Sequence, residues 1–139
     1  MSDLIKPHFM DEDIQRLNLC TDVNKWKSEV THIELENQFY KRIFSSPLIE
    51  KTDINKEDIK FLLEELQTLD LKNQDFSDKL REFINELDGL KECDDLHCET
   101  YYLNTHQKFK VDIENYFFQN RNLKARVYSY TTDGIKKYL

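Results

Sequence analysis

Glycine and proline are scarce in this 139-residue chain, since each occurs twice, at Pro7, Pro47, Gly89 and Gly134. Tight turns between β-strands depend on such residues, so their scarcity argues against a β-sandwich or a barrel. Long apolar runs are also missing, and no stretch approaches the roughly 18 residues that span a bilayer. The length allows a real core, and we expect a single domain.

The chain also lacks the short motifs that mark common enzyme classes. It contains no glycine-rich phosphate loop, no Gly-x-Ser-x-Gly elbow and no dinucleotide fingerprint. The adjacent acids Glu64–Glu65 and Asp94–Asp95 would point about 100° apart on a helix, so neither pair forms a natural acid–base dyad. We therefore expect a protein that is not an enzyme and carries no cofactor.

Acidic residues outnumber basic ones by 27 to 20, which gives a net charge of −7. This charge repels phosphate and argues against nucleic acid or a membrane as partner. The first residues, MSDLIKPHFMDED, turn acidic where a secretory signal needs an apolar region. Three cysteines at irregular spacing, Cys20, Cys93 and Cys98, predict reduced thiols. Together these features predict a cytoplasmic location.

What the chain does contain is an apolar stripe with a 3.5-residue period, present three times. The stripes begin at Val23, Ile59 and Tyr102 and predict helices at 22–45, 56–90 and 96–131. Their members are Val23, Trp26, Val30, Ile33, Asn37, Tyr40 and Phe44; Ile59, Leu62, Leu66, Leu69, Asn73, Phe76, Leu80, Phe83, Leu87 and Leu90; and Tyr102, His106, Phe109, Ile113, Tyr116, Asn120, Leu123, Val127 and Tyr130.

We predict one all-α domain over 1–139, an elongated antiparallel up-down-up helical bundle with coiled-coil-like packing. Because the first long helix is the shortest, one end of the other pair would be left uncovered. A short N-terminal helix within 1–20 is expected to cover that end, and 132–139 is expected to form a tail.

Several residues should define the helix boundaries. Thr21 or Asp22 can cap the first long helix and Asn55 the second, whereas Gly134 should lie beyond the end of the third. A break near Asn73 is the alternative to one unbroken helix, and the continuous register favours the unbroken helix. In the loop at 45–55, three apolar side chains should pack back onto the bundle: Leu48, Ile49 and Ile54.

Four polar residues occupy stripe positions: Asn37, Asn73, His106 and Asn120. A buried amide is costly unless it is paired, but an asparagine in a helical seam can select one alignment of the helices. Register control is therefore the favoured interpretation. The alternative is that two or more of them meet in one layer as a small polar site, in which the imidazole could bind a metal or a proton.

Two groupings are weak candidates for a metal site: Glu29, His32 and Glu36, and Cys93, His97 and Cys98. The first contains the Glu-x-x-His spacing of carboxylate-bridged centres, but those centres need the motif twice. In the second, a thiol and an imidazole four residues apart could share a helical face, although zinc requires further ligands. Neither spacing is specific, so no metal is predicted.

Two surface features could serve binding. Phe61, Tyr101 and Phe118 fall outside the stripes, where aromatic residues can mark a protein-binding face or widen the core. The chain also ends with five basic residues after position 120: Arg121, Lys124, Arg126, Lys136 and Lys137. Compensation of the helix end and ion pairs to acidic neighbours explain them most simply. Contact with nucleic acid, or with an acidic flank of another copy, is the alternative.

The leading hypothesis is a non-catalytic cytosolic protein that acts through protein–protein association, as an adaptor or as a self-associating module such as a homodimer. One alternative is a small metal-binding or redox helical protein that uses the Cys/His grouping. A second alternative is a nucleic-acid-associated adaptor that uses the basic C-terminal end.

Overall fold

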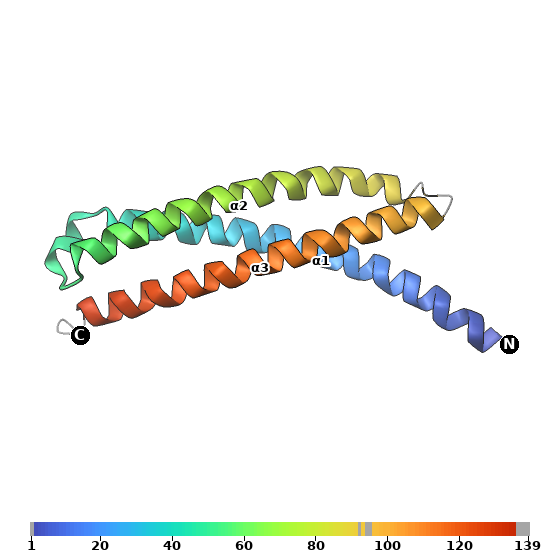
Figure 1. Cartoon of the computed structure of the whole chain (residues 1–139), viewed down its shortest axis with the longest axis horizontal. Coiled ribbons are helices and arrows are strands. Elements are labelled where there is room, and N and C mark those ends of the chain that lie inside the picture. Colours follow the sequence, from blue (N-terminus) through green and yellow to red (C-terminus); the bar gives the residue numbers. More distant parts are fainter. Residues whose placement is uncertain (1, 92, 94–95, 136–139) are drawn as a thin grey trace.

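The computed structural model describes the backbone of residues 2–91, 93 and 96–135, and side chains at 18–89, 93 and 98–134. Three long helices follow one another: α1 (Ser2–Phe44), α2 (Lys56–Lys91) and α3 (Leu96–Ile135), with a short 3-10 helix, η1 (Pro47–Lys51), after α1. α2 runs antiparallel to both α1 and α3 (Figure 1), and the described ranges contain no strand. The predicted all-α antiparallel architecture is confirmed.

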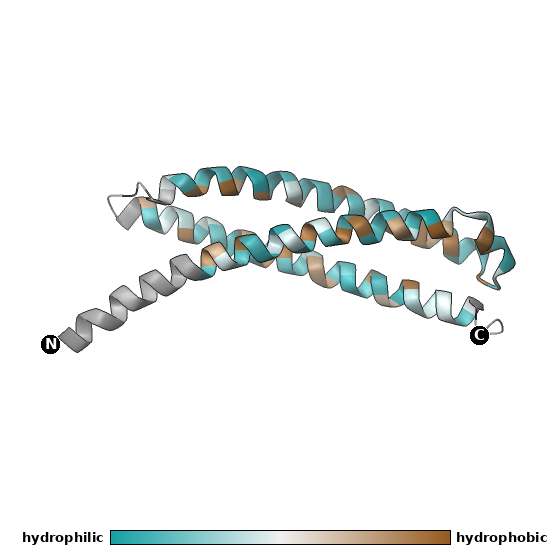
Figure 2. Cartoon of the chain, turned by 180° about the vertical axis from the view of Figure 1, so that it is seen from behind, coloured by the Kyte–Doolittle hydropathy of each residue, from teal (hydrophilic) through white to brown (hydrophobic). Residues whose placement is uncertain are grey.

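The apolar stripes form the core. Ile33, Leu66 and Ile113, one from each helix, are at most 1% exposed. Among the residues whose side chains the structure describes, eighteen hydrophobic ones are buried in two clusters along the bundle. In Figure 2, apolar residues recur at intervals among hydrophilic ones on each helix, as expected for helices with one buried stripe.

α1 is longer than predicted. Residues 2–44 form one helix, so the predictions of a separate N-terminal helix and of a helix cap at Thr21 or Asp22 were wrong. The carboxylate of Asp22 does not cap a helix because it accepts a hydrogen bond from His106 on α3. The backbone of the first part of α1 diverges from α2 and α3 in Figure 1. The expected packing of side chains from 1–17 lies outside the described residues.

The connection between α1 and α2 follows the prediction in part. Asn55 caps α2, because its Oδ1 accepts a hydrogen bond of 2.7 Å from the backbone N–H of Glu57. Ile54 is buried and Ile49 is half-buried, as expected, but Leu48 is 61% exposed and does not pack back. α2 then continues through Asn73 without a break, as predicted.

Gly134 lies inside α3, so it does not end the helix as predicted. A Cβ atom at this position would stand 2.1 Å from Cγ1 of Ile54, and the Gly134 carbonyl accepts a hydrogen bond of 3.0 Å from the Asp53 N–H. Glycine is needed here because the α1–α2 connection crosses close to the end of α3. Residues 136–139 of the predicted tail lie outside the described residues.

Candidate functional site

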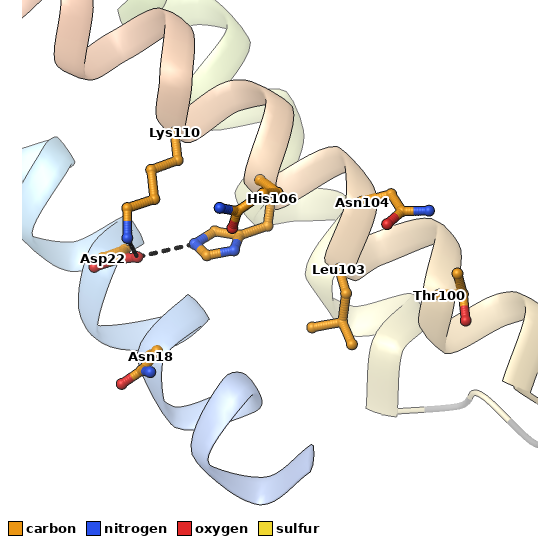
Figure 3. Close-up of a pocket in the computed structure, with 8 residues that line it drawn as sticks. Asn18, Asp22, Thr100, Leu103, Asn104, His106 and Lys110 are labelled. Carbon is orange, nitrogen blue, oxygen red and sulfur yellow. Dashed lines mark hydrogen bonds and ion pairs between the residues drawn. The ribbon is translucent and has the colours of Figure 1, made fainter. Parts of the chain in front are cut away.

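A polar cleft of about 370 Å³ lies between α1 and α3. Figure 3 shows His106 and Lys110 of α3 directed toward Asp22 of α1. Nε2 of His106 lies 3.0 Å from Oδ2 of Asp22, and Nζ of Lys110 lies 3.7 Å from the same oxygen. The other lining residues are Asn18, Thr100, Leu103, Asn104 and Gln107.

His106 is held by two side chains of α1, Asp22 and Trp26, in this cleft. Its side chain is only 8% exposed, and its ring stacks on Trp26 with the centroids 5.4 Å apart. Hydrogen bonding to the Asp22 carboxylate orients the imidazole and satisfies a polar group that would otherwise be buried alone. The arrangement therefore connects α1 to α3.

A second buried polar contact connects all three helices. Asn73 of α2 donates a hydrogen bond of 3.0 Å from Nδ2 to the Val30 carbonyl of α1, and its Oδ1 accepts one of 2.7 Å from the Tyr116 hydroxyl of α3. Burial raises the pKa of Tyr116, and the negative charge of Asp70 raises this pKa further. Asn73 thus contacts both neighbouring helices, as the predicted register role of a seam asparagine requires.

The four predicted seam residues are all buried, between 1% and 7% exposed: Asn37, Asn73, His106 and Asn120. Among the described residues no hydrogen bond joins any two of them. In that part of the chain, Nδ2 of Asn37 has no hydrogen-bond partner. The described hydrogen bonds therefore give no support to the alternative in which two or more of these residues form one polar site.

Glu36 is at the centre of a third polar group, on the outer side of the α1–α3 contact. Lys124 of α3 forms an ion pair with Glu36, and the Tyr40 hydroxyl lies 3.3 Å from Oε2 of Glu36 and 3.4 Å from the Tyr128 hydroxyl. The hydrogen bond to Glu36 raises the pKa of Lys124. Burial, followed by the Tyr128 hydrogen bond and the Glu36 charge, raises the pKa of Tyr40.

The described residues do not form a complete ligand set for either metal candidate. His32 is 3.5 Å from Glu36, but no group of three His, Cys, Asp or Glu side chains that could hold an ion occurs among the described residues. Cys93 and Cys98 form a disulfide across the α2–α3 connection, so the prediction of reduced thiols was wrong at both positions. A disulfide sulfur lacks the thiolate charge that binds zinc. The His97 side chain lies outside the described residues, whereas Cys20 is free and exposed.

Two of the three described residues of the basic end form ion pairs within the chain. Lys124 pairs with Glu36, and Arg126 pairs with Glu65 of α2, with Nη1 and Oε1 2.9 Å apart. Arg121 is exposed and has no ion pair with a described residue. Lys136 and Lys137 lie outside the described residues. These two pairs match the part of the simpler interpretation that expects ion pairs to acidic neighbours.

The three off-stripe aromatic residues are exposed: Phe61 at 51%, Tyr101 at 58% and Phe118 at 57%. They therefore do not widen the core. Among the described side chains, six other large hydrophobic residues are also more than half exposed, and the stripe pattern does not single them out: Leu35, Phe39, Leu48, Leu71, Val111 and Tyr128. The exposure of Val111 could have been predicted from the sequence, because Val111 lies seven residues before Phe118 and shares one helical face with it.

Comparison of the whole chain with protein-family models, with curated proteins and with solved structures finds no match to any of them. None of the helices in the described ranges combines the length and the apolar character that a membrane span requires. Inference about function therefore rests on the contacts and surfaces above.

Proposed function

We propose that this chain is a non-catalytic helical protein that acts through protein–protein association. The observation that carries the proposal is a pair of exposed apolar side chains on α3, Val111 and Phe118, which are 64% and 57% exposed on the side opposite the buried stripe. Exposed apolar side chains are unfavourable in water, and this cost is removed when another protein covers them. Clusters of such side chains mark interaction sites.

The polar contacts support a structural role over a catalytic one. The cleft side chains of Asp22 and His106 bind each other across α1 and α3, and Tyr116 is bound to Asn73 within the core. Each of these groups therefore already forms a hydrogen bond with a side chain of a neighbouring helix. Such contacts hold a rigid scaffold that can present a surface.

Photo-crosslinking tests the proposal directly. A photoreactive phenylalanine analogue replaces Phe118, and in a matched control it replaces Leu71, which is equally exposed but lies on α2. We expect a covalent adduct from position 118 in native-host extract, its mass showing either a second copy or another protein. Absence of any adduct from positions 118, 61, 101 and 39 would overturn the proposal.

The disulfide favours a second candidate, a redox function at Cys93 and Cys98. A dithiol reductant would transfer two electrons and two protons to this bond, giving two thiols and leaving the reductant as a disulfide. Equilibration of the protein in glutathione buffers, followed by alkylation of free thiols, measures the midpoint potential of the Cys93–Cys98 disulfide. A midpoint within the range of cellular glutathione supports a redox role, and a disulfide that stays closed throughout opposes it.

Cytoplasmic location remains a proposal, and the Cys93–Cys98 disulfide weighs against it. Differential alkylation of Cys93 and Cys98 in intact cells would test it, because the cytosol keeps most thiols reduced. Nucleic acid stays a disfavoured partner, since Lys124 and Arg126 are paired with carboxylates. Retention on nucleic acid that falls with salt and is lost in Arg121→Glu would reverse that judgement.

A further inference from the structure

The outer face of α3 differs in composition from the rest of this highly charged chain. Two lines of residues with a seven-residue repeat lie opposite the buried stripe, and all eight side chains are exposed: Tyr101, Lys108, Asn115 and Asn122, and Asn104, Val111, Phe118 and Ala125. Lys108 is the one charged residue among these eight. The face extends over about 36 Å of helix, and its seven-residue repeat is that of a helix-pairing seam.

The charges that flank this face are complementary to each other. Glu114 and Arg121 lie on one edge, both are exposed, and neither has an ion pair with a described residue. They stand seven residues apart, about 10 Å along the axis, so they cannot pair within one helix. An antiparallel copy of the same helix would place each of them opposite its complement.

We propose that the outer face of α3 pairs with the same face of a second copy of this chain, antiparallel and about a two-fold axis near Phe118. This inference rests on the proposed function and names its partner. In such an isologous contact Glu114 of each copy faces Arg121 of the other, which gives two equivalent ion pairs. Phe118 lies beside the axis, and Val111 packs near Ala125 of the other copy.

The amides along the face have a defined role in this arrangement. Asn115 and Asn122 weaken a helical seam relative to apolar residues, but they restrict the register in which two helices can meet. The dimer is therefore a specific and reversible one. Its affinity depends on Val111 and Phe118, and its alignment on the amides and the two ion pairs.

An intrachain role for the same charges makes a different prediction. Lys25 and Glu29 of α1 line a cleft of about 280 Å³ together with Glu114 and Arg121. If the charges serve to pair across that cleft, reversing them would change the stability of a single chain and leave its mass unchanged. Experiments on two different variants mixed together separate these possibilities.

The test measures the mass of the full chain by light scattering across a concentration series. We expect the parent to dimerise, and Glu114→Arg or Arg121→Glu to weaken the dimer at least tenfold, because each variant places like charges opposite each other. An equimolar mixture of these two variants should recover the dimer, since positions 114 and 121 then carry opposite charges at both contacts. Glu64→Arg on α2 is the matched control, and this variant should dimerise to the same extent as the parent.

Two results would overturn the α3 pairing. One is a parent that stays a single chain over the whole concentration range, and the other is a mixture that dimerises no better than either variant alone. If position 118 then crosslinks to a different protein, the proposed function survives and only the choice of partner fails. If no exposed position crosslinks to anything, both fail.

Discussion

Removal of the Tyr116 hydroxyl is expected to destabilise the bundle more than a Tyr→Phe substitution at any other position. In Tyr116→Phe, Oδ1 of Asn73 loses the donor that now lies 2.7 Å away, and Asn73 is only 2% exposed. A buried acceptor left without a donor costs about 1–3 kcal/mol. At an unfolding entropy of roughly 2.1 cal/mol/K per residue, this loss lowers the Tm by about 3–10 °C.

The assay is urea unfolding followed by circular dichroism, with Tyr130→Phe as the matched control. Tyr130 is half-buried, and its hydroxyl makes no hydrogen bond within the described part of the chain, so its removal should change the unfolding free energy by less than about 0.5 kcal/mol. In Asn73→Leu/Tyr116→Phe the orphaned acceptor is gone, and the loss should be smaller than the sum of the two single losses. A Tyr116→Phe variant as stable as Tyr130→Phe would refute the reasoning.

Three further predictions concern other contacts. Asp22→Asn removes the carboxylate that binds the buried His106 and should cost roughly 1–3 kcal/mol in urea unfolding, whereas an unchanged midpoint would contradict the bridge between α1 and α3. Burial raises the folded-state pKa of Tyr116. The protonated Tyr116 hydroxyl therefore contributes fully to the unfolding free energy below about pH 10, and its contribution falls as the pH rises further. If the unfolding free energy of the parent falls no more steeply at alkaline pH than that of Tyr116→Phe, this pH dependence is excluded. Gly134→Ala should destabilise by about 1–3 kcal/mol, because the new methyl group meets Ile54; a gain in stability, as for an open helical site, would show that the close approach is absent.

The stripe pattern was sufficient to predict the three-helix fold because each helix buries residues at a single period. Ile33, Leu66 and Ile113 needed no information beyond that spacing. The burial of Asn73 and His106 was predicted for the same reason, since a seam position is buried whatever side chain occupies it. The partners of these side chains were not predictable, because they lie on other helices.

The errors have a common physical cause. Asp22 has the chemistry of a helix cap, and only the position of His106 on α3 shows that its carboxylate is used elsewhere. Gly134 resembles a helix terminator, yet it is required by the proximity of Ile54 from a different part of the chain. The Cys93–Cys98 bond likewise depends on a Cα–Cα distance of 5.5 Å, which spacing in the sequence does not fix.

The central claim is that the exposed outer face of α3, with Val111 and Phe118, is covered by another protein, here a second copy. The most direct measurement is the mass of the untagged full chain by light scattering as its concentration rises. Our account predicts a shift from the single-chain mass of 16.9 kDa toward twice that value, and reversal of the shift in Phe118→Glu. A constant single-chain mass in the parent, or an identical shift in Phe118→Glu, would contradict it.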